Sequence, residues 1–98
     1  METIRTRRVA ELLKHEIARI LANDIKDPRV QGAIITRVKV TADLGMARVY
    51  FNSYNKDLLR DLEIGLGRSK GFIRRQLMSS VHLKKLPQLI FERDAVPE

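Results

Sequence analysis

Residues 64–91 collect positive charge with no acidic residue among them, and we call this segment the basic tract. Gly67 and Gly71 lie in its middle and indicate a joint in a helix, because glycine weakens a helix by about 1 kcal/mol relative to alanine. A helix that starts at such a joint offers backbone N–H groups and a favourable dipole to an anion. The chemistry predicted here is phosphate binding, by six cations: Arg68, Lys70, Arg74, Arg75, Lys84 and Lys85.

No combination of side chains in the sequence predicts catalysis. His15 and Glu16 resemble the start of a zinc-protease helix, but Arg19 stands where the second histidine ligand belongs. Cysteine is absent, which removes thiolate nucleophiles and thiolate ligands. We therefore expect a protein that is not an enzyme, with no catalytic residue, no metal site and no cofactor.

The composition favours an anionic partner. The chain has 98 residues, a formal net charge of +7 and a sequence pI near 10.3, so nucleic acid or an anionic membrane surface is the expected partner class. No apolar run approaches the roughly 20 residues of a membrane span, and the N-terminus lacks a signal-peptide pattern. The predictions are one domain over residues 1–98 with a short flexible tail at 94–98, a cytoplasmic location and no membrane partner.

The elements that must position the basic tract follow from the hydrophobic period. Residues 4–25 have apolar side chains at a three-four spacing, which predicts an amphipathic helix that ends before Asp27-Pro28. After Gly32 the period changes to two, which predicts two strands joined by a turn at residues 41–45. The helical period resumes near Asn55, passes through the glycine joint, and a third strand covers residues 88–93.

This order predicts an α+β fold, α-β-β-α-kink-α-β, with a three-stranded sheet and the helices packed on one face. The second strand should point Ala47, Val49 and Phe51 inward. In the first strand, two sets should point in opposite directions: Ile34, Thr36, Val38 and Val40 one way, and Ile35, Arg37 and Lys39 the other. Arg37 and Lys39, with Arg48, would form a second basic surface.

Three kinds of partner remain open from the residues alone. Aromatic residues are few, so contact with phosphates and shape fits better than base stacking on an exposed sheet. A helix-turn-helix DNA reader is the nearest competitor to a general RNA-binding protein, because two short helices would meet at a glycine-containing turn. The flanking hairpin and third strand argue against the all-helical context that is usual for that motif. A membrane-surface role for the first helix is less favoured, because the sheet needs that apolar stripe as cover.

Several blocks, in this order, resemble the ribosome-binding factor A family, bacterial small-subunit assembly factors with a type II KH-like fold. The blocks are Asp27-Pro28-Arg29, the strand pattern from Val38 to Tyr50, Gly71-Phe72-Ile73-Arg74-Arg75-Gln76-Leu77, and Leu83 to Phe91 with Asp94. The GxxG loop of most KH domains is absent, since three residues separate Gly67 from Gly71. Ser69-Lys70-Gly71 takes the place of the family's Ala-x-Gly kink.

The resemblance implies a monomeric assembly factor that binds the immature 30S subunit and 16S rRNA near the decoding region and the 5′-terminal helix. It also implies a part in late maturation and 16S rRNA processing, cold adaptation and a functional link to a ribosome-associated GTPase. An RNA-binding protein without ribosomal preference, or the DNA reader, is the alternative. The predicted RNA contact has a centre and a periphery: Arg68, Ser69, Lys70, Gly71, Arg74 and Arg75, widened by Lys84, Lys85, Arg5, Arg7 and Arg8.

Overall fold

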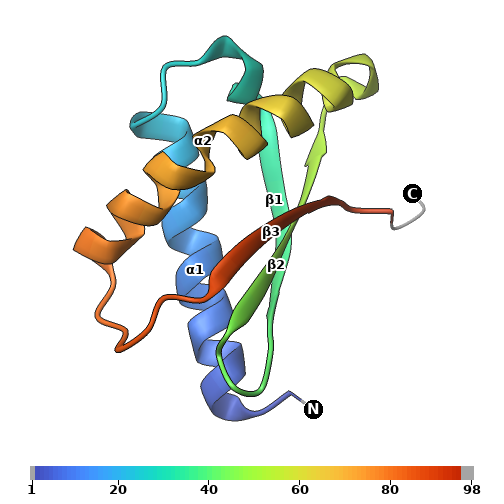
Figure 1. The fold of residues 1–98 in the computed structure, drawn as a ribbon. Coiled ribbons are helices and arrows are strands. Elements are labelled where there is room, and N and C mark those ends of the chain that lie inside the picture. The colour runs from blue at the N-terminus through green and yellow to red at the C-terminus, as the bar shows by residue number, and fades with distance from the viewer. Residues whose placement is uncertain (1, 96–98) are drawn as a thin grey trace.

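A three-stranded sheet forms one layer of the fold in the computed structural model, which describes residues 2–95 (Figure 1). The strands are β1 (Ala33–Val40), β2 (Met46–Ser53) and β3 (Gln88–Arg93). Strand β2 is central, pairs antiparallel with β1 through the 41–45 turn, and pairs parallel with β3. The predicted sheet is confirmed, and the last strand in the chain lies beside its centre.

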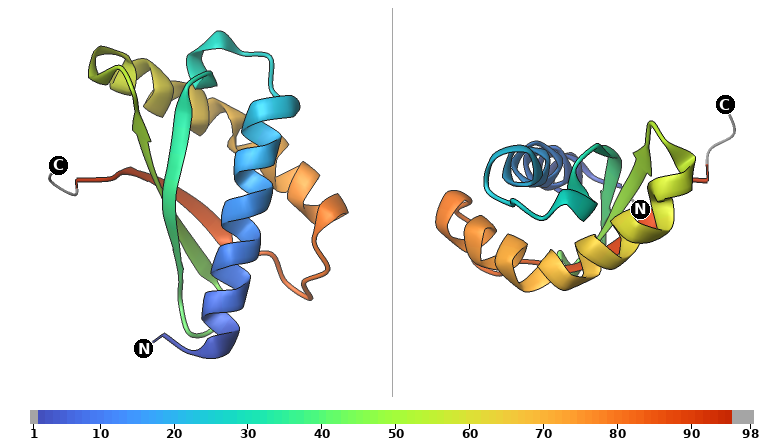
Figure 2. Two further views of the ribbon diagram at one scale, coloured as in Figure 1. Left: turned by 180° about the vertical axis from the view of Figure 1, so that it is seen from behind. Right: turned by 90° about the horizontal axis from the view of Figure 1, so that it is seen from above.

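The two long helices form the second layer. Helix α1 (Ile4–Asn23) runs alongside β1, and α2 (Leu59–Ser80) crosses nearer to β3 (Figure 2). Two short 3₁₀ turns, η1 (Pro28–Val30) and η2 (Lys56–Leu58), connect these helices to the strands. Apolar residues of both helices and of the sheet's inner face make one core, whose fully buried members include Leu13, Ile17, Ile20, Val49, Phe51, Leu62, Leu66, Ile73, Leu77 and Leu89.

A β-bulge in β1 changes which residues face this core. The register against β2 shifts between Ile35 and Arg37, so one extra residue reverses the alternation of side chains. Ile35, which precedes the bulge, is 9% exposed and belongs to the core. Val38 and Val40, which follow the bulge, are partly buried and pack against the same core. The prediction that Ile34 and Thr36 point the same way as Val38 and Val40, and Ile35 the opposite way, is therefore wrong across the bulge, because Ile35 shares the core face with Val38 and Val40.

Helix α2 is one continuous helix of 22 residues, and this corrects the predicted joint. From above it is a single bowed helix that runs through both glycines (Figure 2). Backbone N–H groups inside a helix donate to the preceding turn, so those of residues 67–71 are not open to an anion. The two glycines cost helical stability, but core residues on both sides, Leu66 and Ile73, hold the segment in place.

The ends of the described chain are held by backbone and side-chain contacts. Helix α1 ends at Asn23, two residues earlier than predicted. Asp94, the first residue of the predicted flexible tail, donates its backbone N–H to the Phe51 carbonyl oxygen at 2.8 Å and pairs with Arg37. Residues 96–98 of that tail lie outside the described residues. Within residues 2–95, neither helix is long and apolar enough to cross a membrane.

Candidate nucleic-acid interface

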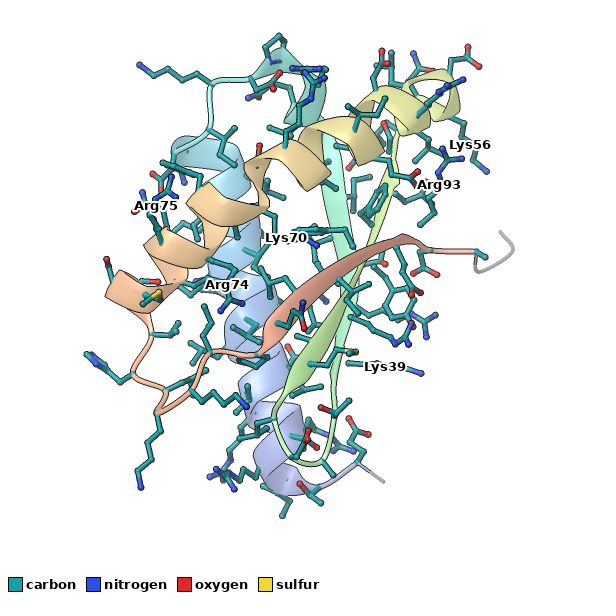
Figure 3. The ribbon with its side chains drawn as sticks, viewed as in Figure 1. Lys39, Lys56, Lys70, Arg74, Arg75 and Arg93 are labelled. Atoms are coloured by element: carbon teal, nitrogen blue, oxygen red, sulfur yellow. The ribbon has the colours of Figure 1, made fainter. Side chains whose placement is uncertain are left out.

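Four of the six cations of the basic tract lie on two opposite flanks of α2. Residues seven apart share a helical face, which puts Arg68 with Arg75 on the flank toward η1. Lys70 and Arg74, four residues apart, share the flank toward β3. Figure 3 shows Lys70 and Arg74 on one side of α2 and Arg75 on the other. The predicted centre of the RNA contact is therefore spread around a convex helix rather than gathered at one point.

The small residues between these cations have different surroundings. Gly67 and Gly71 are exposed, and a Cβ atom added at Gly67 would meet nothing within 4 Å. Ser69 is half-buried. The two glycines therefore leave an exposed strip of helix without side chains.

Arg74 has a structural contact that the sequence did not indicate. Its Nη1 donates a hydrogen bond to the Pro87 carbonyl oxygen at 2.7 Å, and the side chain is half-buried. This bond ties α2 to the loop that leads into β3. The remaining guanidinium N–H groups leave Arg74 able to contact an anion at the same place.

Residues 81–87 form the loop between α2 and β3, and the loop carries Lys84 and Lys85. Val81 and Pro87 are buried, Leu83 and Leu86 are half-buried, and both lysines are exposed. The apolar residues anchor the loop to the core, so the lysine side chains leave it in a fixed place.

A hollow lies on either side of this loop, and the two hollows share Leu83, Lys84 and Lys85. The first, about 310 Å³, lies toward α1 and the β1–β2 turn, with Arg5 and His82 also in its lining. The second, about 340 Å³, lies toward the end of α2, where Arg74 and Met78 line it. Four predicted site residues thus meet here, from three separate parts of the chain: Arg5, Arg74, Lys84 and Lys85.

One carboxylate, Asp43, lines the first hollow. Hydrogen bonds from the Thr41 hydroxyl at 2.7 Å and the Gly45 N–H at 2.9 Å hold its pKa below the ordinary value, and nearby Lys85 contributes less. Its charge therefore persists at neutral pH, but one of its oxygens is occupied by its own turn. The cations that line the two hollows outnumber this carboxylate, so the charge around the hollows stays positive.

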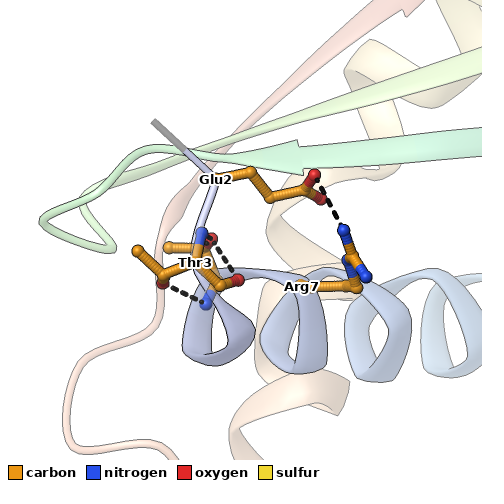
Figure 4. A network of polar contacts seen from close by, with 4 residues as sticks. Glu2, Thr3 and Arg7 are labelled. Carbon is orange, nitrogen blue, oxygen red and sulfur yellow. Dashed lines mark hydrogen bonds and ion pairs between the residues drawn. The ribbon is translucent and has the colours of Figure 1, made fainter.

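The N-terminal turn of α1 is capped by Thr3 and carries three arginines, of which Figure 4 shows Arg7. Thr3 caps the helix, since its hydroxyl oxygen accepts from the Thr6 N–H at 3.2 Å and its own N–H donates to the Thr6 hydroxyl at 2.8 Å. Arg5 lines the first hollow. Arg7 instead pairs with Glu2 at 3.5 Å, and Arg8 is exposed.

Ion pairing separates the basic tract from most other arginines. Within residues 2–95, six arginines have a carboxylate oxygen within 4.0 Å: Arg7, Arg19, Arg29, Arg37, Arg48 and Arg93. In the same part of the chain, none of the six cations of the basic tract has such a partner. A cation without a carboxylate partner has no ion pair to give up on meeting a phosphate.

The outer face of the sheet is less basic than its sequence indicated. Arg37 lies 4.2 Å above the centre of the Tyr50 ring and pairs with Asp94, whereas Arg48 pairs with Glu92. Of the predicted second basic surface only Lys39 lacks a carboxylate partner among the described residues. Cross-strand pairing thus neutralises most of this face.

Sequence reasoning missed the contact that fixes the first half of α2. A Cβ atom built on Gly65 would lie 3.0 Å from Arg29 Cβ and from Val30 Cγ1, so α2 approaches η1 as closely as a glycine allows. In η1, the backbone N–H and then the side chain of Arg29 hold the pKa of Asp27 below its ordinary value. A glycine within an apolar helical stripe is the signal that could have indicated this contact.

Comparisons with known proteins agree on one family. The family model for ribosome-binding factor A matches residues 5–98. The ribosome-binding factor A of Syntrophobacter fumaroxidans is 44% identical over 98 residues, covering 97% of this chain and 84% of the relative. That of Enterococcus faecalis is also 44% identical, covering 96% and 83%.

Solved structures show the same fold at lower identity. The crystal structure of ribosome-binding factor A from Thermus thermophilus has a TM-score of 0.79 at 20% identity, and covers 90% of this chain and 94% of its own. The solution structure of a Thermotoga maritima protein, described as a putative ribosome binding factor A, has a TM-score of 0.80 at 19% identity, covering 100% and 95%. The predicted KH-like α+β fold is confirmed.

Proposed function

The chain belongs to the ribosome-binding factor A family, and on that premise we propose that it binds the 30S ribosomal subunit and aids its maturation. Membership of a family of non-enzymatic assembly factors confirms the prediction that the chain is not an enzyme. A Thermus thermophilus homology model fitted into a map of a 30S–RbfA complex has a TM-score of 0.67 to this chain at 24% identity. That complex concerns the relative, and it supports the proposal for this chain.

The proposed ligand within the subunit is 16S rRNA, near the decoding region and the 5′-terminal helix. The proposed consequences are late 16S rRNA processing, greater need in the cold and a functional link to a ribosome-associated GTPase, for a monomeric cytoplasmic protein. The observation that carries the RNA contact is the set of six cations in the basic tract without a carboxylate partner among residues 2–95. Such cations attract a polyphosphate backbone, and binding should weaken as salt rises.

The helix-turn-helix alternative loses its basis in the structure. It required two helices that meet at a glycine turn, and α2 is instead one helix through both glycines. A general RNA-binding protein without ribosomal preference remains the competing function, because free cations alone do not select one RNA.

Co-sedimentation across a salt series separates the two. The protein would be mixed with purified small subunits, large subunits or bulk RNA. We expect retention on small subunits at salt concentrations that release bulk RNA, because a shaped rRNA site adds contacts beyond charge. A variant with Lys26→Glu and Arg60→Glu controls for loss of positive charge elsewhere, since both residues are exposed and lie outside the basic tract. It should keep the parent protein's retention on small subunits. Equal and equally salt-sensitive retention on all three partners would overturn the ribosomal preference.

A further inference from the structure

We infer that the RNA contact is centred on the 81–87 loop and its two hollows, and that its ligand is an unpaired RNA strand. This inference rests on the proposed function and names the part of the surface and the class of RNA. It moves the centre away from residues 68–75, where the sequence had placed it. Three observations carry it: the concave shape, the charge and the apolar lining.

The concave shape is found at the loop between α2 and β3. The hollows of about 310 and 340 Å³ flank the loop and are of the size of small ligand sites. Arg68 and Arg75, by contrast, line neither hollow, and Figure 3 shows Arg75 on the other side of α2 from Arg74. A strand that crosses the loop can enter a hollow on either side, whereas the outer surface of α2 offers only a convex contact.

The charge at the loop comes from side chains that converge. Lys84 and Lys85 line both hollows, with Arg5 on one side and Arg74 on the other. Against these four cations stands Asp43, whose carboxylate accepts hydrogen bonds within its own turn. Consecutive phosphates of one strand can therefore contact cations that are separated in the sequence.

The apolar lining argues for unpaired bases. Met78 is 69% exposed and stands in the second hollow beside Leu83 and Leu86. Methionine is flexible and its sulfur makes favourable contacts with aromatic rings. Unpaired bases offer such rings, whereas a duplex keeps its base faces stacked inside. A duplex would contact the lysines and leave these apolar side chains unused.

The test compares variants on a short fluorescent oligoribonucleotide and on the same sequence as a duplex, each by anisotropy in a salt series. We expect tighter binding to the unpaired RNA. With Lys84→Glu and Lys85→Glu, the slope of log affinity against log salt should flatten by about 1.4, since each lost phosphate contact on a single strand accounts for about 0.7. The matched variant with Arg68→Glu and Arg75→Glu should change the slope less.

Met78→Ala isolates the apolar contact. Because its side chain is exposed, the variant should fold normally, lose severalfold in affinity for the unpaired RNA and keep the salt slope of the parent protein. Circular dichroism of every variant checks the fold. Equal affinity for duplex and unpaired RNA, or a larger effect at Arg68 and Arg75 than at Lys84 and Lys85, would overturn the inference. Neither outcome depends on ribosomal preference, which the subunit sedimentation tests separately.

Discussion

Replacing both outer glycines of α2 by alanine should stabilise the protein. Both positions lie inside a continuous helix, where alanine is favoured over glycine by about 1 kcal/mol per site. The new Cβ at position 67 would meet nothing within 4 Å, and that at position 71 would lie 3.6 Å from Arg75 Nη1, an ordinary contact. The double variant Gly67→Ala, Gly71→Ala should therefore gain about 2 kcal/mol in free energy of unfolding.

Urea unfolding followed by circular dichroism measures this gain, and the midpoint of thermal unfolding should rise by roughly 8–16 °C. Gly65→Ala is the matched control on the same helix. There the Cβ would lie 3.0 Å from Arg29 Cβ and Val30 Cγ1, and overpacking costs about 1–3 kcal/mol against a similar helical gain of about 1 kcal/mol. We expect the control to be neutral or destabilised. A double variant less stable than the parent would refute the continuous helix and restore a functional joint at residues 67–71.

Three further changes test other contacts. Arg74→Met removes the bond to the Pro87 carbonyl and should cost about 1–3 kcal/mol in urea unfolding, whereas Arg75→Met, on the exposed flank, should stay within about 0.5 kcal/mol. Phe51→Ala should cost about 3–5 kcal/mol, since the ring is fully buried at the centre of the sheet; a smaller loss would mean that the core collapses around the gap. Asp27 has a pKa below its ordinary 3.8 in the folded state, so its contribution is present above about pH 4 and is lost as pH falls further; Asp27→Asn should flatten the pH dependence of stability in that range, and an unchanged profile would contradict the assigned bonds.

Periodicity was sufficient for most of the fold. The inward set of β2, Ala47, Val49 and Phe51, is fully buried as its alternation predicts. The same rule failed in β1, because a bulge adds a residue without any mark in the sequence: Thr36 is a good strand former, and its hydroxyl bonds to the Tyr50 carbonyl oxygen and the Asp94 carboxylate, far along the chain. Local pattern does not contain such long-range partners.

The candidate site was less predictable from the sequence than the fold. The sequence identified the unpartnered cations, because an absence of nearby acids is a local property. It could not say that Arg5 and Lys85 meet across one hollow, since that placement depends on how α1 and the 81–87 loop pack. The glycine joint was wrongly predicted for a related reason. Helix propensity is a weak preference, and core contacts on both sides of Gly67 and Gly71 override it.

The place of β3 in the sheet has a consequence for how the protein is made. The central strand β2 cannot pair with its parallel neighbour β3 until residues 88–93 have been synthesised and have left the ribosomal exit tunnel. Until then the nascent chain can form α1 and the β1–β2 hairpin, but Leu89 is missing from the core and one edge of β2 is unpaired. Cooperative folding should thus be late and nearly all-or-none, and a chain stalled before β3 should be a target for chaperones and proteases.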